Sequence, residues 1–142
     1  LDATPPERRP AFEGSLSTAF GCTLEGRITL AQVQEAAERL MAAGCDEVGL
    51  ADTTGYANPA QVKAWVRGVR GVVGEAALTG VHLHNTRGTG LASIYAALPA
   101  GCLIAVDDCV DEQHGKHRFV RDFLARIGVE PVVTVVPDAA SA

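Results

Sequence analysis

The sequence predicts an α/β fold in which about four strand–helix units contribute to one parallel sheet. Three features of the 142 residues support this prediction. Short apolar runs alternate with amphipathic stretches of helical periodicity, the predicted strands begin roughly 30 residues apart, and polar residues follow each predicted strand. Strands separated by such a length are joined by a crossover helix, and strands joined in this way lie parallel.

The first unit follows a proline-rich stretch over residues 1–14, which we expect to be an irregular lead-in. The run Ser15–Gly21 is the first predicted strand. A helix is predicted over Leu30–Ala43, because Thr29 is a suitable N-cap and Gln32, three residues later, completes a capping box.

The second unit has an apolar strand, Glu47–Ala51, followed by a turn at residues 52–55. Asn58 is the predicted N-cap of the next helix, and Pro59 occupies the first helical position, where a missing N–H removes no helical bond. This helix is predicted to end at about Val72.

The third unit consists of the strand Leu78–His84 and a helix over about Gly88–Leu98. The fourth strand is predicted at Cys102–Val106. Beyond it we expect a helix at about Lys116–Ile127 and an apolar strand at Pro131–Val136.

The composition favours one ordered domain. Apolar residues make up 47% of the chain and charged residues 20%, which is enough for a core. The net charge of −5 argues against a broad nucleic-acid surface. No apolar run approaches the ~20 residues of a membrane-spanning helix, so no membrane partner is expected. The chain opens on Leu1 without a signal-peptide pattern, which suggests a fragment or a processed chain.

The four cysteines form no Cys-x-x-Cys pair, so we expect reduced thiols and a cytoplasmic location. Cys22 is expected near the site as a pocket-lining residue. Cys45 and Cys102 are expected in the core. Cys109 is either an acid near the end of the fourth strand or, more ordinarily, a structural cysteine.

The most informative feature is a pair of histidines, His82 and His84, at the end of the third predicted strand. Residues two apart in a strand point to the same face, with Cα atoms roughly 6.6 Å apart. Two imidazoles on one face can supply two ligands to one metal ion. The alternative interpretation is a pair of polar residues bonded to backbone or water at a strand end.

Other polar residues follow the other predicted strands, at the end of a parallel sheet where sites are built. Asp52 follows the second strand, where it is either a site residue or only a turn acceptor. Arg87 is either a contact for a phosphate or carboxylate or a surface charge. Asp107 and Asp108 follow the fourth strand, where they either complete a metal sphere or cap the next segment.

Two further histidines, His114 and His117, lie in a short basic segment. They form either a second metal pair or, as the ordinary alternative, a solvated turn.

Three segments resemble a known family. Phe20–Gly26, Gly49–Gly55 with Asn58-Pro59, and Val81–Gly88 with Gly90-Leu91-Ala92 resemble the segments that follow the fifth, sixth and seventh strands of hydroxymethylglutaryl-CoA lyases. The resemblance runs from about Ser15 to Gly101. It implies that residues 15–110 form half of a (β/α)8 TIM barrel, namely family strands five to eight. Residues 111–142 form a divergent C-terminal segment.

The resemblance also implies a function. It implies a divalent cation, Mg or Mn, and cleavage of 3-hydroxy-3-methylglutaryl-CoA to acetyl-CoA and acetoacetate. His82 and His84 would be metal ligands, with His82 also moving a proton from the substrate hydroxyl. Asp52 would be catalytic and would contact the acyl-CoA substrate, together with Thr54 and Arg87.

The sequence also departs from the family. It has no counterpart of the family's first-strand aspartate and arginine, nor of its glycine-rich cysteine loop and asparagine ligand. A four-stranded half barrel would leave two open edges and an apolar inner face, so we expect a homo-oligomer or a missing N-terminal barrel half. The alternatives are a non-catalytic remnant with a packing or metal-binding role, and a related aldolase or acyl-transferring synthase.

Overall fold

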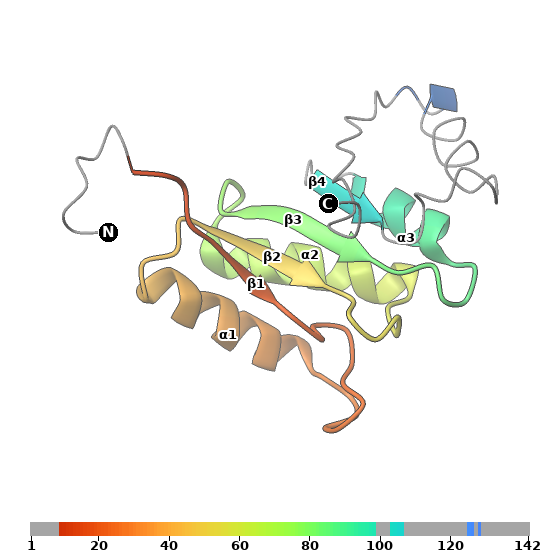
Figure 1. The fold of residues 1–142 in the computed structure, drawn as a ribbon, viewed down its shortest axis with the longest axis horizontal. Coiled ribbons are helices and arrows are strands. Elements are labelled where there is room, and N and C mark those ends of the chain that lie inside the picture. Colours follow the sequence, from red (N-terminus) through yellow and green to blue (C-terminus); the bar gives the residue numbers. More distant parts are fainter. Residues whose placement is uncertain (1–8, 99–102, 107–124, 127, 129–142) are drawn as a thin grey trace, which may run out of the picture. The chain divides into compact units, whose positions relative to one another are not determined.

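The computed structural model describes residues 9–98, 103–106, 125–126 and 128. The chain divides into two units, residues 1–106 and 107–142. The first unit contains seven elements (Figure 1). They are β1 (Glu13–Leu16), α1 (Leu30–Ala42), β2 (Glu47–Ala51), α2 (Pro59–Val73), β3 (Leu78–Leu83), α3 (Gly90–Ala97) and β4 (Leu103–Val106).

The four strands form one sheet in the order β1-β2-β3-β4, and every neighbouring pair is parallel. The predicted α/β fold with a parallel sheet is therefore confirmed. Successive right-handed crossovers in one direction place their helices on the same face of a sheet. Accordingly α1 contacts β1 and β2, α2 contacts β3, and α3 contacts β3 and β4, while neighbouring helices contact each other (Figure 1).

Both long helices begin where their capping residues predict. The Thr29 hydroxyl accepts from the backbone N–H of Gln32 at 3.3 Å, and the Gln32 side chain accepts from the Thr29 N–H at 2.8 Å. This pair is the predicted capping box. The Asn58 side chain accepts from the backbone N–H of Gln61 at 3.0 Å, with Pro59 at the first helical position. The predicted starts of α1 and α2 are thus confirmed.

The core lies between the sheet and the helices. Val48 and Leu50 of β2 and Val81 and Leu83 of β3 point toward the helices, and each is at most 1% exposed. The facing side of α2 presents valines at helical spacing, namely Val62, Val66 and Val69. Full burial of one such side chain contributes about 1.5–3 kcal/mol, so this layer holds the βα units together.

The opposite face of the sheet is made of small and polar residues. Gly49, Gly80 and His82 alternate with the core residues on β2 and β3, and the Glu13 carboxylate lies directly over Gly49. A β-carbon on Gly49 would collide with the Oε1 atom of Glu13. For the described side chains of β1 to β3, the expectation of an apolar inner face is therefore wrong.

The first strand begins earlier than predicted. β1 is Glu13–Leu16 instead of Ser15–Gly21, because Phe12 already accepts backbone bonds from the N–H groups at 46 and 47. Thr18 then adopts φ 56°, which turns the chain out of the strand. The apolar end of the predicted strand is buried by this turn and not by sheet pairing. The irregular lead-in accordingly ends before Glu13, short of the predicted residue 14.

The third helix begins two residues later than predicted. Gly88 has φ 69° and donates its N–H to the Asn85 carbonyl at 3.1 Å, which closes a turn before α3. The Asn85 side chain then accepts from the N–H of Gly90 at 2.8 Å. The strands β3 and β4 match their predicted ranges within one residue at each end.

Several predicted features fall outside the described residues. Of the predicted helix at 116–127 only Ala125 and Arg126 are described, and both are helical. The predicted strand at 131–136 and the boundary at 110–111 lie outside the described part. No helix in the described ranges is long and apolar enough to span a bilayer.

Candidate metal and substrate site

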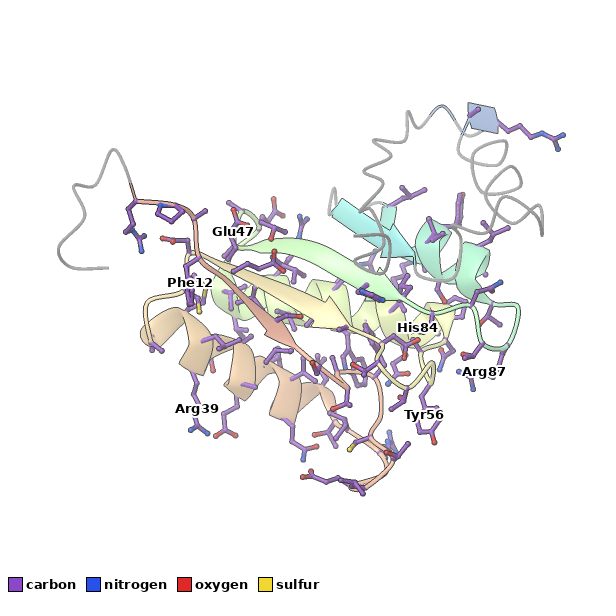
Figure 2. All side chains as sticks on the ribbon, viewed as in Figure 1. Phe12, Arg39, Glu47, Tyr56, His84 and Arg87 are labelled. Atoms are coloured by element: carbon purple, nitrogen blue, oxygen red, sulfur yellow. The ribbon has the colours of Figure 1, made fainter. Side chains whose placement is uncertain are left out.

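The two histidines lie where β3 ends. His82 is the penultimate residue of β3 and His84 follows its last residue, Leu83. Their Nε2 atoms are 3.2 Å apart, and the rings stack with centroids separated by 5.0 Å and planes inclined by 21°. The two imidazoles therefore project to the same side, as the alternation of a strand predicts. Figure 2 shows His84 at the end of the sheet toward which β2 and β3 point, with Arg87 and Tyr56 nearby.

The spacing of the two nitrogens fits a shared metal ion. Two ring nitrogens bound at about 2.1 Å to one ion, with roughly 90–110° between them, are about 3.0–3.4 Å apart. An N–H···N hydrogen bond between the rings fits the observed distance as well, with the tautomer deciding which ring donates. Within the described residues no cluster of three or more His, Cys, Asp or Glu side chains is placed to hold an ion. If the pair binds an ion, the other ligands lie outside the described residues or outside this sequence.

Asp52 lies beside the histidine strand and is almost completely buried, at 1% exposure. Its backbone N–H donates to the carbonyl of His82 at 2.9 Å, and its Oδ1 accepts from the N–H of Ala57 at 3.0 Å. Its Oδ2 is buried without a hydrogen-bond partner among the described residues. The carboxylate thus serves as the turn acceptor that the sequence allowed, and it retains one unbonded oxygen.

Thr54 and Arg87 are bonded to neighbouring loops. The Thr54 hydroxyl donates to the carbonyl of Gly21 at 2.8 Å. The Nη2 of Arg87 donates to the carbonyls of Tyr56 at 2.6 Å and Ala57 at 2.9 Å. Both side chains therefore connect one loop at the strand ends to the next. Their substrate contacts stay a prediction.

Further side chains complete this connection, and sequence reasoning did not identify them. Thr86 donates from its hydroxyl to the carbonyl of Gly55 at 2.9 Å. Gln61 and Trp65 of α2 donate to the carbonyls of residues 20 and 19, at 2.9 and 3.0 Å. Each acceptor is a backbone carbonyl distant in sequence, so no residue pattern marks the pair. The loops after β1, β2 and β3 consequently form one hydrogen-bonded rim around the carboxyl ends of the strands.

Cys22 lies in the loop after β1, which two backbone bonds of 2.8 Å close between Cys22 and Gly26. The N–H groups of Glu25 and Leu24 point at the sulfur and lower the pKa of the Cys22 thiol below its ordinary value. Leu24 donates to this sulfur at 3.4 Å. Cys45 is buried, as expected of a core cysteine.

The remaining candidate residues lie outside the described part of the chain. They are Cys102, Asp107, Asp108, Cys109, His114 and His117. Their predicted roles stay predictions.

A parallel sheet with its helices on one face and polar loops at the carboxyl ends of its strands is the arrangement found in α/β-barrel enzymes. The chain belongs to the HMGL-like family, whose model matches residues 10–111.

Named relatives and solved structures agree with this assignment. The chain is 40% identical over 90 residues to the (R)-citramalyl-CoA lyase of Chloroflexus aurantiacus, covering 63% of this chain and 28% of the relative. It is 40% identical over 97 residues to the cytoplasmic 3-hydroxy-3-methylglutaryl-CoA lyase of Mus musculus, covering 68% and 28%. Its fold is similar, with a TM-score of 0.70 and 31% identity, to an HMG-CoA lyase of Acinetobacter baumannii in complex with coenzyme A and 3-methylmalate, covering 87% and 43% of the two chains.

The chain thus spans less than a third of these curated relatives and less than half of the solved lyase. The part that it shares includes the sheet and the loops that carry His82, His84 and Asp52. Activity of the whole protein is consequently a matter for proposal.

Proposed function

We propose that this chain carries the histidine half of a metal-dependent carbon–carbon lyase that cleaves 3-hydroxy-3-methylglutaryl-CoA to acetyl-CoA and acetoacetate. The observation that supports it most is the pair of stacked imidazoles, His82 and His84, with Nε2 atoms 3.2 Å apart at the end of β3. The family assignment supports the reaction class. The bound coenzyme A in a similar lyase supports an acyl-CoA substrate.

His82 and His84 would hold a divalent cation, with Mn favoured over Mg because the ligands are nitrogens. When bound, such an ion supplies a Lewis acid that polarises the substrate oxygens. The remaining ligands would come from strands that this sequence lacks or from Asp107 and Asp108. The rim of bonded loops would keep the imidazoles in place, since Asp52 is fastened to the His82 carbonyl.

The cleavage requires a base for the tertiary hydroxyl. We assign this role to His82, because histidine is the side chain that most often serves as a general base and His82 lies at the end of β3 beside the proposed site. As the hydroxyl becomes the ketone of acetoacetate, the carbon–carbon bond breaks and its electron pair goes to the acetyl-CoA carbon. That carbon then needs a proton. Cys109 is the thiol that follows the fourth strand, and the family's own acid loop has no counterpart here.

A second acyl group is a candidate, because one relative of equal identity is named a citramalyl-CoA lyase. Both substrates are 3-hydroxyacyl-CoA esters, and both would present a hydroxyl and an acyl oxygen to the same two imidazoles. Product analysis distinguishes them, since citramalyl-CoA yields pyruvate where the methylglutaryl ester yields acetoacetate.

The first experiment is a calorimetric titration of the purified chain with Mn. We expect saturable binding that His82→Ala and His84→Ala each abolish, and that the double variant His114→Ala/His117→Ala retains. Binding lost only in the latter variant, or no binding to the unaltered chain, would contradict the metal site and favour the non-catalytic remnant. Lyase assays with a separately supplied polypeptide bearing family strands one to four would then test turnover, with His82→Ala as the inactive control.

A further inference from the structure

We infer that a second site, a pocket for a small phosphate-bearing anion, lies between α2 and α3 on the helical side of the sheet. A hollow of about 530 Å³ opens there, lined on α2 by Lys63, Arg67 and Arg70 and on α3 by Ala96. This volume lies within the range of small-molecule sites. One carboxylate, Glu75, also lines it, which leaves an excess of two positive charges in a chain whose net charge is −5.

The three cations share one face of α2, because their spacing of four and three residues matches helical periodicity. Like charges at this spacing destabilise a helix. The ion pair found among the described residues joins Arg9 to Asp46. Glu75 therefore forms no ion pair with any of the three cations. An anion bound in the hollow would remove this repulsion.

Arg70 provides the second observation. Its Nε atom is buried, with no hydrogen-bond partner among the described residues. A buried N–H donor without an acceptor costs free energy, and such groups normally have a partner. A turn of the guanidinium into the hollow, which Arg70 lines, would end this burial and present its donors to a phosphate, because guanidinium groups bind phosphate in a paired geometry.

The shape of the hollow allows an organic group next to the phosphate. Val66 and Ala96 give it an apolar wall, and Gly71 leaves open space where a side chain would otherwise stand. We therefore expect a phosphate ester or diphosphate of a small molecule, and not a sulfate-sized ion alone.

This pocket is distinct from the histidine site. The imidazoles project from the face of the sheet that the helices of the first unit do not cover, whereas α2 and α3 lie on the other face. Glu75 lies just before the start of β3 at Leu78. His84 follows Leu78 by six residues, which is about 20 Å along a strand. The inference thus goes beyond the proposed lyase activity and does not depend on it.

The test is a calorimetric titration of the full chain and its variants with inorganic pyrophosphate in metal-free buffer, with the NMR signal of the Arg70 Nε–H followed in the unaltered chain. We expect saturable shifts of the Arg70 signal, and an affinity at least about tenfold lower in Arg67→Gln/Arg70→Gln. The matched control Arg39→Gln, on α1, should bind as the unaltered chain does. His82→Ala should bind equally, since the two sites are separate.

The indole signal of Trp65, the sole tryptophan, reports whether each variant is folded, because its N–H is bonded to Ala19. Shifts that sodium chloride reproduces at equal ionic strength would overturn the proposal, since they would reflect charge screening. Equal binding by the double variant and the control would also overturn it.

Discussion

The backbone N–H of Asp52 donates to the carbonyl of His82 at 2.9 Å, so the residue that follows β2 is fastened to the strand that carries the histidine pair. The Asp52 side chain in turn holds the N–H of Ala57, at the far end of the same loop. A single buried aspartate therefore links the strand, the loop and the start of α2. Any contact of Asp52 with the substrate would be additional to this structural role.

Two substitutions separate these roles of Asp52. Asn retains an oxygen for the Ala57 N–H, so Asp52→Asn should change the free energy of unfolding by less than about 1 kcal/mol. Asp52→Ala leaves that N–H without its acceptor and should cost about 1–3 kcal/mol. Urea denaturation measures both. If the charge serves the reaction, Asp52→Asn lowers turnover in the reconstituted assay while it remains folded. Full activity of Asp52→Asn would restrict the residue to its role in the loop.

Gly55 is predicted to be intolerant of any side chain. It has φ 68°, and a β-carbon there would lie 2.7 Å from the Cγ2 atom of Thr86. Gly26 is a matched control, since its φ is 76° and a β-carbon would meet no atom within 4 Å. Gly26→Ala should cost about 1–2 kcal/mol from the left-handed conformation alone.

Gly55→Ala should cost at least about 1 kcal/mol more than this control, from the collision between two loops. The excess should diminish but not vanish in a Thr86→Ala background, which removes the Oγ1 and Cγ2 atoms and leaves the Cβ of residue 86 at 2.9 Å. Unfolding curves of the four variants measure these differences. Equal costs at the two glycines would show that the contact between the loops does not constrain position 55.

Arg87 is predicted to hold the loop after β2. Arg87→Met removes the donor to the Tyr56 and Ala57 carbonyls, so amide exchange over residues 53–57 should accelerate several-fold. Because Arg87 is exposed, the cost in the free energy of unfolding should be about 1 kcal/mol. Arg87→Lys should protect the loop only in part, because an ammonium lacks the planar fork of a guanidinium. Unchanged exchange with weakened coenzyme A binding would instead favour the substrate contact.

The sequence predicted those features that local rules determine. The capping box of Thr29 and Gln32 involves neighbouring residues, and the alternation that places His82 and His84 on one side is a property of any strand. The extent of β1 was predicted wrongly, because apolar residues indicate burial but do not indicate whether a strand or a turn buries them. Phe20 is 3% exposed, yet the turn after β1 buries it.

The rim of the site was beyond sequence reasoning for a different reason. Thr86, Arg87 and Gln61 bond to backbone carbonyls 30 to 41 residues away. Every residue has a backbone carbonyl, so the acceptor leaves no mark in the sequence. The sequence suggested either a phosphate or carboxylate contact or a surface charge for Arg87, and it gave no sign of the bonds to the neighbouring loop.

Cys22 is predicted to be the most reactive thiol of the described part of the chain. The N–H groups of Glu25 and Leu24 stabilise its thiolate, which lowers the pKa of the thiol below the ordinary value of 9.0. The thiolate is the nucleophile, so alkylation of Cys22 by iodoacetamide at neutral pH should exceed that of a free thiol. Peptide mapping identifies the modified cysteine, and Cys45, which is buried, should react only on unfolding.

The pH dependence of Cys22 alkylation shows in which direction the pKa of the thiol is shifted. The rate of Cys22 alkylation in the folded chain should rise at a lower pH than in urea, where the loop amides no longer face the sulfur. Because the folded pKa is the lower one, the linked contribution to stability is present above the unfolded pKa and is lost as the pH falls through the folded pKa. Coincident rate profiles in the folded and unfolded chain would mean that the amides of the loop leave the thiol unperturbed.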